Sequence, residues 1–99
     1  MDRSTIIASL RRHEAELKAE GIEHLVLHGS YARGTAVPGV SDVDVIADFA
    51  RSRKLSLISR IRVENRLSDI LGIRADLADR RMLLSEVRDR AESESVLVF

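Results

Sequence analysis

Two short stretches of this chain combine residue types that could bind phosphates and a metal ion. Residues 28–35 (HGSYARGT) place a Gly-Ser turn directly after an apolar run, and residues 41–45 (SDVDV) follow shortly afterwards. Because alternate residues of a β-strand share a face, Asp42 and Asp44 should project their carboxylates to the same side. Carboxylate oxygens are ligands that Mg²⁺ prefers, so this pattern predicts a site that holds Mg²⁺ ions against the phosphates of a nucleotide.

The Gly-Ser turn supplies groups that suit the phosphates. A turn between a strand and the start of a helix presents free backbone N–H groups to an anion. Gly29 lets the backbone come close to a phosphate, and the hydroxyl of Ser30 adds a hydrogen-bond donor. Arg33 could either steady the phosphates or brace the loop by pairing with Asp42, and we leave both roles open. His28 is interpreted as a packed strand residue.

A two-metal site also needs a third carboxylate, which assists the nucleophile and completes a metal shell. Asp76 is the best candidate, because it lies in the apolar stretch 73–78 between Ala75 and Leu77, which should both point to the core. Asp76 should point away from the core, opposite to Ala75 and Leu77, and this favours Asp76 over the nearby Asp79.

Residues 42–49 alternate as expected for a strand between a core and a site. One face carries Val43, Val45, Ala47 and Phe49, and the other carries Asp42, Asp44, Ile46 and Asp48. Asp48 lies at the far end of this strand, so we interpret it as structural or solvent-exposed rather than as a metal ligand.

The other patterns predict helices around a few short strands. In order, they indicate a helix over residues 4–20, a buried strand over 22–28, a short helix over 30–33, a loop over 34–41, a helix over 55–71, a strand over 73–78, a helix over 83–92 and a short apolar tail or edge strand over 96–99. Asp2 or Ser4 could cap the first helix, and Gly21 and Gly72 are suitable stops. The order predicts one α/β (α+β) domain over residues 1–99, a small mixed β-sheet with helices packed on it.

Two further predictions concern the helix over residues 55–71 and the segment before it. Its core-facing side is predicted to be apolar, formed by Leu55, Ile58, Ile61, Leu67, Ile70 and Leu71. The basic residues Arg51, Arg53 and Lys54 are interpreted as a solvated loop.

Composition argues against several classes of function. Basic and acidic residues are equal in number, 16 each, so no broad basic surface is expected to recruit nucleic acid. Only three residues are aromatic types (3% of the chain), which argues against single-strand binding by base stacking. The chain has no cysteine, which excludes disulfides and thiolate metal sites. The absence of a signal-type segment and of a membrane-spanning apolar run predicts a cytoplasmic location without membrane association.

Residues 29–35 (GSYARGT) together with residues 41–44 (SDVD) resemble the minimal nucleotidyltransferases of the DNA polymerase beta superfamily. The combination is more specific than either half alone, and the resemblance runs on through Asp76 to residues 96–99. Small members of this kind act as antitoxins paired with HEPN toxins. The resemblance implies the polymerase beta-like fold, a small mixed sheet with helices packed on it.

The resemblance also implies a reaction and a role for each motif residue. Family members transfer a nucleoside monophosphate from a nucleoside triphosphate to an acceptor hydroxyl, and in the antitoxin branch AMP passes from ATP to a tyrosine of the HEPN toxin, silencing its RNase activity. Gly29 and Ser30 would bind the triphosphate, Asp42 and Asp44 would bind Mg²⁺, and Asp76 would support the nucleophile as metal ligand or base.

Two alternatives remain beside this interpretation. The same fold could neutralise its toxin by steric cover alone, without catalysis. A purely structural protein has no reason to cluster three carboxylates, whose repulsion without a cation would cost stability, so the enzyme is favoured. The acceptor could instead be a small molecule, but 99 residues leave little room for a second pocket wall, and we expect another protein to present the acceptor.

Overall fold

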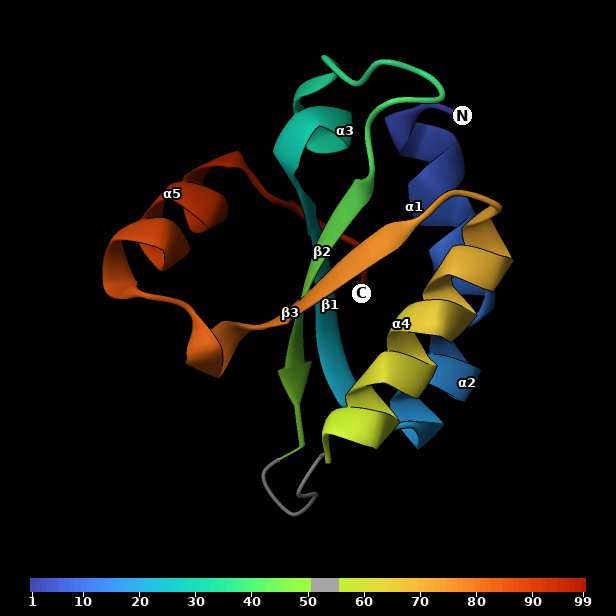
Figure 1. Cartoon of the computed structure of the whole chain (residues 1–99), viewed down its shortest axis with the longest axis vertical. Coiled ribbons are helices and arrows are strands. Elements are labelled where there is room, and N and C mark those ends of the chain that lie inside the picture. Colours follow the sequence, from blue (N-terminus) through green and yellow to red (C-terminus); the bar gives the residue numbers. More distant parts are fainter. Residues whose placement is uncertain (51–55) are drawn as a thin grey trace.

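A four-stranded sheet, with strand order β3-β2-β1-β4, is the centre of the fold (Figure 1). The structure is a computed structural model, which describes residues 1–50 and 56–99. Strand β1 pairs antiparallel with both β2 and β4, whereas β2 and β3 run parallel, so the sheet is mixed as predicted. Its elements in chain order are α1 (Arg3–Arg12), α2 (Glu14–Ala19), β1 (Ile22–His28), α3 (Gly29–Arg33), β2 (Val43–Phe49), α4 (Leu57–Leu71), β3 (Ala75–Asp79), a 3-10 turn η1 (Arg80–Met82), α5 (Ser85–Glu94) and β4 (Val96–Leu97).

The main hydrophobic core lies between one face of the sheet and helices α1, α2 and α4. The alternation predicted for β2 is confirmed on this face, where Val43, Val45, Ala47 and Phe49 are all buried. Helices α1 and α2 contribute Leu10 and Leu17, neither of which is exposed at all. Burial of these aliphatic side chains fixes which face of β2 is turned away from the core, and that face carries Asp44.

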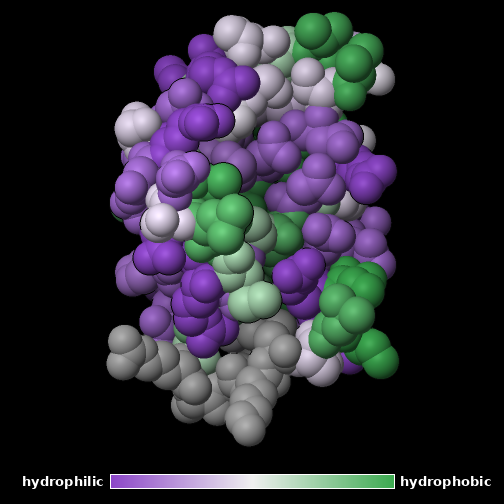
Figure 2. Space-filling view, turned by 60° about the vertical axis from the view of Figure 1, so that its left-hand side comes forward, coloured by the Kyte–Doolittle hydropathy of each residue, from purple (hydrophilic) through white to green (hydrophobic). Residues whose placement is uncertain are grey.

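The opposite face of the sheet is covered by α5, over a smaller apolar cluster. Val26, Ile46 and Ala91 are buried in it. Ile46 lies on the same face of the sheet as Asp44, and it packs under α5. Figure 2 brings this side of the molecule forward and shows apolar side chains in its middle, surrounded by hydrophilic ones.

The first helical stretch is two helices rather than the single helix predicted over residues 4–20. Asp2 caps α1 by accepting a hydrogen bond from the Thr5 N–H at 2.8 Å. At His13 the backbone N–H turns to the Leu10 carbonyl at 3.0 Å, and the ring Nδ1 donates to the Ser9 carbonyl at 2.9 Å. The side chain thus takes the acceptor that an unbroken α-helix would have offered to the His13 N–H, and the helix breaks there.

Helix α4 begins after Ser56, two residues later than predicted, and it stops at Gly72 as predicted. Its buried face differs from the prediction. The buried residues are Val63, Leu67 and Leu71, spaced by four, whereas Ile58 is 72% exposed and Ile61 is 46% exposed. At about 100° per residue these two isoleucines lie on the side of the helix opposite the buried stripe. The prediction that Ile58 and Ile61 face the core is wrong.

Helix α4 also covers the outer edge of β3. The Glu64 carboxylate accepts the Leu77 N–H at 2.8 Å, and the Ser68 hydroxyl accepts the Ala75 N–H at 2.9 Å. These are edge amides, because β3 is the last strand of the described sheet and has β2 as its neighbour on the other side. Two side chains of α4 therefore hold the strand that carries Asp76.

Other boundaries differ from the predictions by a few residues. Strand β1 has its predicted bounds, while β3 and α5 each begin two residues later than predicted. The predictions for Leu55 and for the basic residues Arg51, Arg53 and Lys54 lie outside the described residues. Within residues 1–50 and 56–99, no helix has the length and apolar character needed to cross a membrane.

Candidate active site

The register of the parallel pair β2 and β3 places two of the predicted carboxylates side by side. Asp44 and Asp76 are direct partners across these strands, and neighbouring strands lie about 4.8 Å apart. Ala75 and Leu77, on either side of Asp76, are buried as predicted. Strand alternation therefore brings Asp44 and Asp76 onto one face at the same level of the sheet.

Asp42, just before β2, lies within reach of the same group of charges. Its Oδ2 is 3.8 Å from the Nε of Arg74, and the same Nε is 3.7 Å from Oδ1 of Asp76. Arg74 thus lies between the two carboxylates, two residues before Asp76 on the same side of the chain. This arginine was not identified from the sequence, although the spacing Arg74-x-Asp76 was a signal that the two share a face.

Gly29 passes directly beside Asp44. It has a positive φ of 74°, and a Cβ placed on it would lie closer to the Asp44 Oδ2 than real side-chain contacts allow. Any other residue would collide with this carboxylate and would also be strained in the left-handed region. The Gly-Ser turn and the aspartate pair, separate in sequence, therefore form one local structure.

Ser30 follows Gly29 in the short helix α3, which ends at Gly34. The Ser30 carbonyl accepts the Thr35 N–H at 2.9 Å, closing the turn after the helix. Ser30 is half-buried, at the same end of the sheet as Asp44. The predicted phosphate-binding residues Gly29 and Ser30 thus adjoin the carboxylates.

Arg33, the third predicted phosphate-binding residue, forms an ion pair with Glu94 of α5. Its Nη1 lies 3.1 Å from the Glu94 Oε2, and both side chains are substantially exposed. The brace from Arg33 to Asp42, one of the two roles left open, is not formed, since Asp42 pairs with Arg74. An exposed pair of this kind is weak, so Arg33 can exchange Glu94 for another anion at little cost.

His28 is a second residue whose place beside the carboxylates was not predicted from the sequence. It is half-buried and pairs across the antiparallel strands β1 and β2 with Asp44. Burial lowers the pKa of His28, against the opposing effect of the Asp44 charge. The sequence did contain a signal for this placement, because His28 is the last residue of its strand and immediately precedes Gly29. The structure places Gly29 in contact with Asp44.

The surroundings of the Asp44 carboxylate disfavour its charged form. Burial raises its pKa above the ordinary value, and the neighbouring charges of Asp76 and Asp42 raise it further, while His28 and Arg33 act in the opposite direction. The ionised form of Asp44 is therefore disfavoured, and a bound cation would stabilise it.

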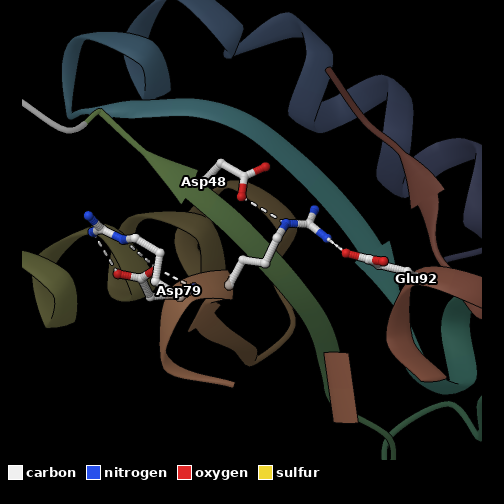
Figure 3. Close-up of polar contacts among 5 residues, drawn as sticks. Asp48, Asp79 and Glu92 are labelled. Carbon is white, nitrogen blue, oxygen red and sulfur yellow. Dashed lines mark hydrogen bonds and ion pairs between the residues drawn. The ribbon is translucent and has the colours of Figure 1, made fainter. Parts of the chain in front are cut away.

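Asp48 and Asp79, near the last residues of β2 and β3, form ion pairs with Arg80 and Arg81 (Figure 3). The Asp48 carboxylate accepts from the Nε of Arg80 at 2.7 Å, and Nη1 of the same arginine reaches Glu92 at 3.2 Å. Asp79 accepts from the backbone and side chain of Arg81. The interpretation of Asp48 as structural agrees with these contacts. The choice of Asp76 over Asp79 as the third carboxylate stays a prediction.

The donor set fits Mg²⁺. Asp42, Asp44 and Asp76 offer hard oxygen ligands from one side of two adjacent strands, and Gly29 lies directly against Asp44. Within the described part of the chain, no three acidic or histidine side chains already stand in the arrangement of a metal site. The guanidinium of Arg74 lies between two of these carboxylates.

Two hollows adjoin the cluster. A cavity of about 400 Å³ is lined by Asp42, Arg74 and the loop residues Val40 and Ser41, among others. On the other side, a shallow groove runs under α5 and is lined at one end by His28 and Arg33. Of the three carboxylates, Asp42 lines the first of these hollows, and the second is lined by His28, the cross-strand partner of Asp44.

Sequence comparisons identify a family. A profile described as nucleotidyltransferase domain matches residues 10–98. The protein adenylyltransferase MntA of Thermococcus cleftensis is 36% identical over 90 residues, covering 90% of this chain and 88% of that protein. A Methanocaldococcus jannaschii protein, provisionally named a protein adenylyltransferase, is 39% identical over 75 residues, covering 75% of this chain and 74% of that protein.

Solved structures agree with the family. One described as a minimal nucleotidyltransferase superposes with a TM-score of 0.78 at 30% identity, covering 97% of this chain and 95% of that one. A complex from Shewanella oneidensis, between a tri-AMPylated HEPN toxin and an MNT antitoxin, matches with a TM-score of 0.70 at 17% identity, covering 98% of this chain and 71% of that chain. This second likeness shows the fold alone. The profile spans the Gly-Ser turn, all three carboxylates and the whole sheet, and the chain therefore belongs to the nucleotidyltransferase domain family and is a nucleotidyltransferase of the minimal type.

Proposed function

We propose that this nucleotidyltransferase is an Mg²⁺-dependent protein adenylyltransferase that acts as an antitoxin. It would transfer AMP from ATP to a tyrosine hydroxyl of a partner HEPN-type RNase toxin and so neutralise that toxin. The observation that carries the proposal is the pairing of Asp44 with Asp76 across β2 and β3, with Gly29 packed against Asp44.

Each residue of the site has a distinct task in this reaction. Asp42, Asp44 and Asp76 would hold the metal ions, while Gly29 and Ser30 would bind the triphosphate together with Arg33 once it leaves Glu94. Bound Mg²⁺ supplies activation of the attacking oxygen and neutralises charge on the leaving pyrophosphate.

The group transfer is balanced without a further reactant. The acceptor oxygen forms a bond to the α-phosphorus of ATP, the bond from that phosphorus to the bridging oxygen breaks, and pyrophosphate leaves with the electron pair. The proton of the acceptor hydroxyl must be removed, and the Asp76 carboxylate is the candidate acceptor. Asp76 is 48% exposed, so an incoming hydroxyl can reach it.

The relatives support a protein acceptor and a HEPN partner. The Thermococcus cleftensis relative is named a protein adenylyltransferase, and the Shewanella oneidensis structure holds a HEPN toxin that carries AMP groups beside its MNT antitoxin. The described domain is small and the Asp76 carboxylate is exposed, which suits an acceptor that a second protein presents.

The direct test is AMP transfer to the protein encoded by the neighbouring gene. We expect incubation with labelled ATP and Mg²⁺ to add the mass of one or more AMP units to a tyrosine of that protein and to abolish its RNase activity. The Asp44→Asn variant should lose transfer, because it removes the carboxylate at the centre of the cluster.

Other outcomes separate the alternatives. A partner that is neutralised without gaining mass would indicate an antitoxin that acts by binding alone. Label on a small-molecule hydroxyl, with none on protein, would indicate a small-molecule nucleotidyltransferase. Transfer that continues in the Asp44→Asn variant would overturn the assignment of the metal site.

A further inference from the structure

Arg74 occupies a position that the proposed reaction leaves without a role. Its Nε lies almost equally far from two carboxylate oxygens, 3.8 Å from the Asp42 Oδ2 and 3.7 Å from the Asp76 Oδ1. Both contacts are ion pairs that are too long for hydrogen bonds. The single positive charge of Arg74 therefore forms an ion pair with each of the two carboxylates.

The backbone and the side chain of Arg74 differ in how firmly they are held. The Arg74 carbonyl accepts the Val43 N–H at 2.9 Å, so the start of β3 is fixed against β2. The side chain is 76% exposed and lines the cavity of about 400 Å³ beside Asp42. The guanidinium can consequently swing away from the carboxylates without disturbing the core.

We propose that Arg74 is a built-in counter-ion of the metal site, which Mg²⁺ must displace in order to bind Asp42 and Asp76. This inference rests on the metal site of the proposed function. Arg74 neutralises part of the repulsion between Asp42 and Asp76, and its long, exposed ion pairs are weak enough for a divalent cation to replace. As a positioning residue, it sets the Mg²⁺ concentration at which the site assembles.

The test measures metal binding without the reaction. The melting temperature of the full chain is followed while MgCl₂ replaces NaCl at constant ionic strength, and the midpoint of the Mg²⁺-dependent rise is recorded. We expect the Arg74→Met variant, which keeps an unbranched apolar stem but loses the charge, to lower this midpoint roughly threefold to tenfold, as expected for the loss of weak competing ion pairs.

Two matched variants isolate the charge at this position. Arg74→Lys keeps a cation and should keep a midpoint close to that of the wild type. Arg66→Gln removes an arginine from an exposed ion pair with Glu16, at the surface between α4 and α2, and should also leave the midpoint unchanged. A purely structural role for Arg74 would lower the melting temperature without Mg²⁺ and would leave the midpoint where it was.

The outcomes distinguish this inference from the proposed function. A wild-type rise that disappears in Asp44→Asn but has the same or a higher midpoint in Arg74→Met would overturn the role of Arg74 and leave the metal site standing. An Arg74→Lys midpoint as low as that of Arg74→Met would overturn the role of Arg74 in the same way. A wild type that shows no Mg²⁺-dependent rise, or one that persists in Asp44→Asn, would overturn the metal site itself.

Discussion

At the scale of single residues, Gly29 lies so close to the Asp44 carboxylate that a side chain added at Gly29 must displace it. The positive φ of Gly29 and its approach to the Asp44 carboxylate join the phosphate-binding turn to the metal-binding strand. Asp44 in turn is flanked by His28 on one strand and Asp76 on the other. The contact between Gly29 and the Asp44 carboxylate therefore matters both for the proposed chemistry and for the backbone conformation of the turn.

Substituting Gly29 with Ala should damage both stability and transfer. We expect the free energy of unfolding to fall by roughly 1–3 kcal/mol, because the methyl group adds a collision with Asp44 to the strain of a left-handed backbone. AMP transfer should be lost at the same time, since Asp44 must move. The measurements are thermal or urea unfolding and the transfer assay.

Gly72→Ala is the matched control for this substitution. Gly72 also has a positive φ, 68°, but an added Cβ would meet nothing within 4 Å. It should lose about 1 kcal/mol from backbone strain alone and keep its transfer activity. Wild-type transfer by the Gly29→Ala variant would show that the contact with Asp44 does not matter.

Asp44→Asn should make the metal-free protein more stable at neutral pH while abolishing transfer. The pKa of Asp44 in the folded protein is raised, chiefly by burial, so its favourable contribution is complete only below the unfolded-state pKa. That contribution is lost as the pH rises through the folded-state pKa, and the neutral amide avoids this loss. Melting curves with a chelator, recorded from acidic to neutral pH, check the sign.

Asp48→Asn provides a control of the opposite sign on the same strand. It removes an ion pair with Arg80 and should lower stability by up to about 1 kcal/mol. If Asp44→Asn were also destabilising at neutral pH without metal, the unfavourable charge assigned to Asp44 would be wrong.

At the scale of elements, α4 does more than cover the core. Its buried stripe packs under the sheet, while Glu64 and Ser68 accept the edge N–H groups of Leu77 and Ala75. Those two amides lie on either side of Asp76 in sequence. The position of the third carboxylate therefore depends on a helix that contributes no residue to the site.

Glu64→Ala should loosen β3 and slow transfer. The Leu77 N–H loses a charged acceptor at 2.8 Å, and we expect a cost of roughly 1–3 kcal/mol together with faster amide hydrogen exchange at Leu77. Glu64→Gln, whose side-chain carbonyl can still accept this bond, should retain most of the protection. Equal exchange rates at Leu77 in Glu64→Ala and the wild type would show that the edge contact contributes nothing.

At the scale of the whole molecule, the two faces of the sheet are unequal. Helices α1, α2 and α4 lie over one face, and α5 covers part of the other (Figure 1). The carboxylates lie at the end of the less covered face, where α3 and the loop before β2 meet the sheet. Because the helices cover the two faces unequally, one face of the sheet forms the main core and the other leaves the site accessible.

Which strand residues face the core and which face the site could largely be predicted from the sequence, because strand alternation is a local property. The buried set beginning with Val43 and the opposite placement of Asp44 and Asp76 depend only on a period of two. The orientation of α4 could not be predicted in the same way, since Ile58 and Ile61 are as apolar as Val63 and Leu67 and only the partner surface decides which are buried.

The parts of the site that escaped prediction are pairings between distant segments. Arg74 meets Asp42 across 32 positions of sequence, and Arg33 meets Glu94 across 61. Such ion pairs depend on the register of β2 with β3 and on where α5 returns to the sheet. Neither is encoded in the local pattern around Arg74 or Arg33.

The side chains at the sheet's edge have a consequence for assembly. Edge strands with free N–H and C=O groups invite a foreign strand to add to the sheet. Here Glu64 and Ser68 occupy amides of β3, and at the β4 side the Nε of Arg11 donates to the Val98 carbonyl at 2.7 Å. These contacts occupy part of each edge and so disfavour the addition of a strand from a second copy of this chain at these positions.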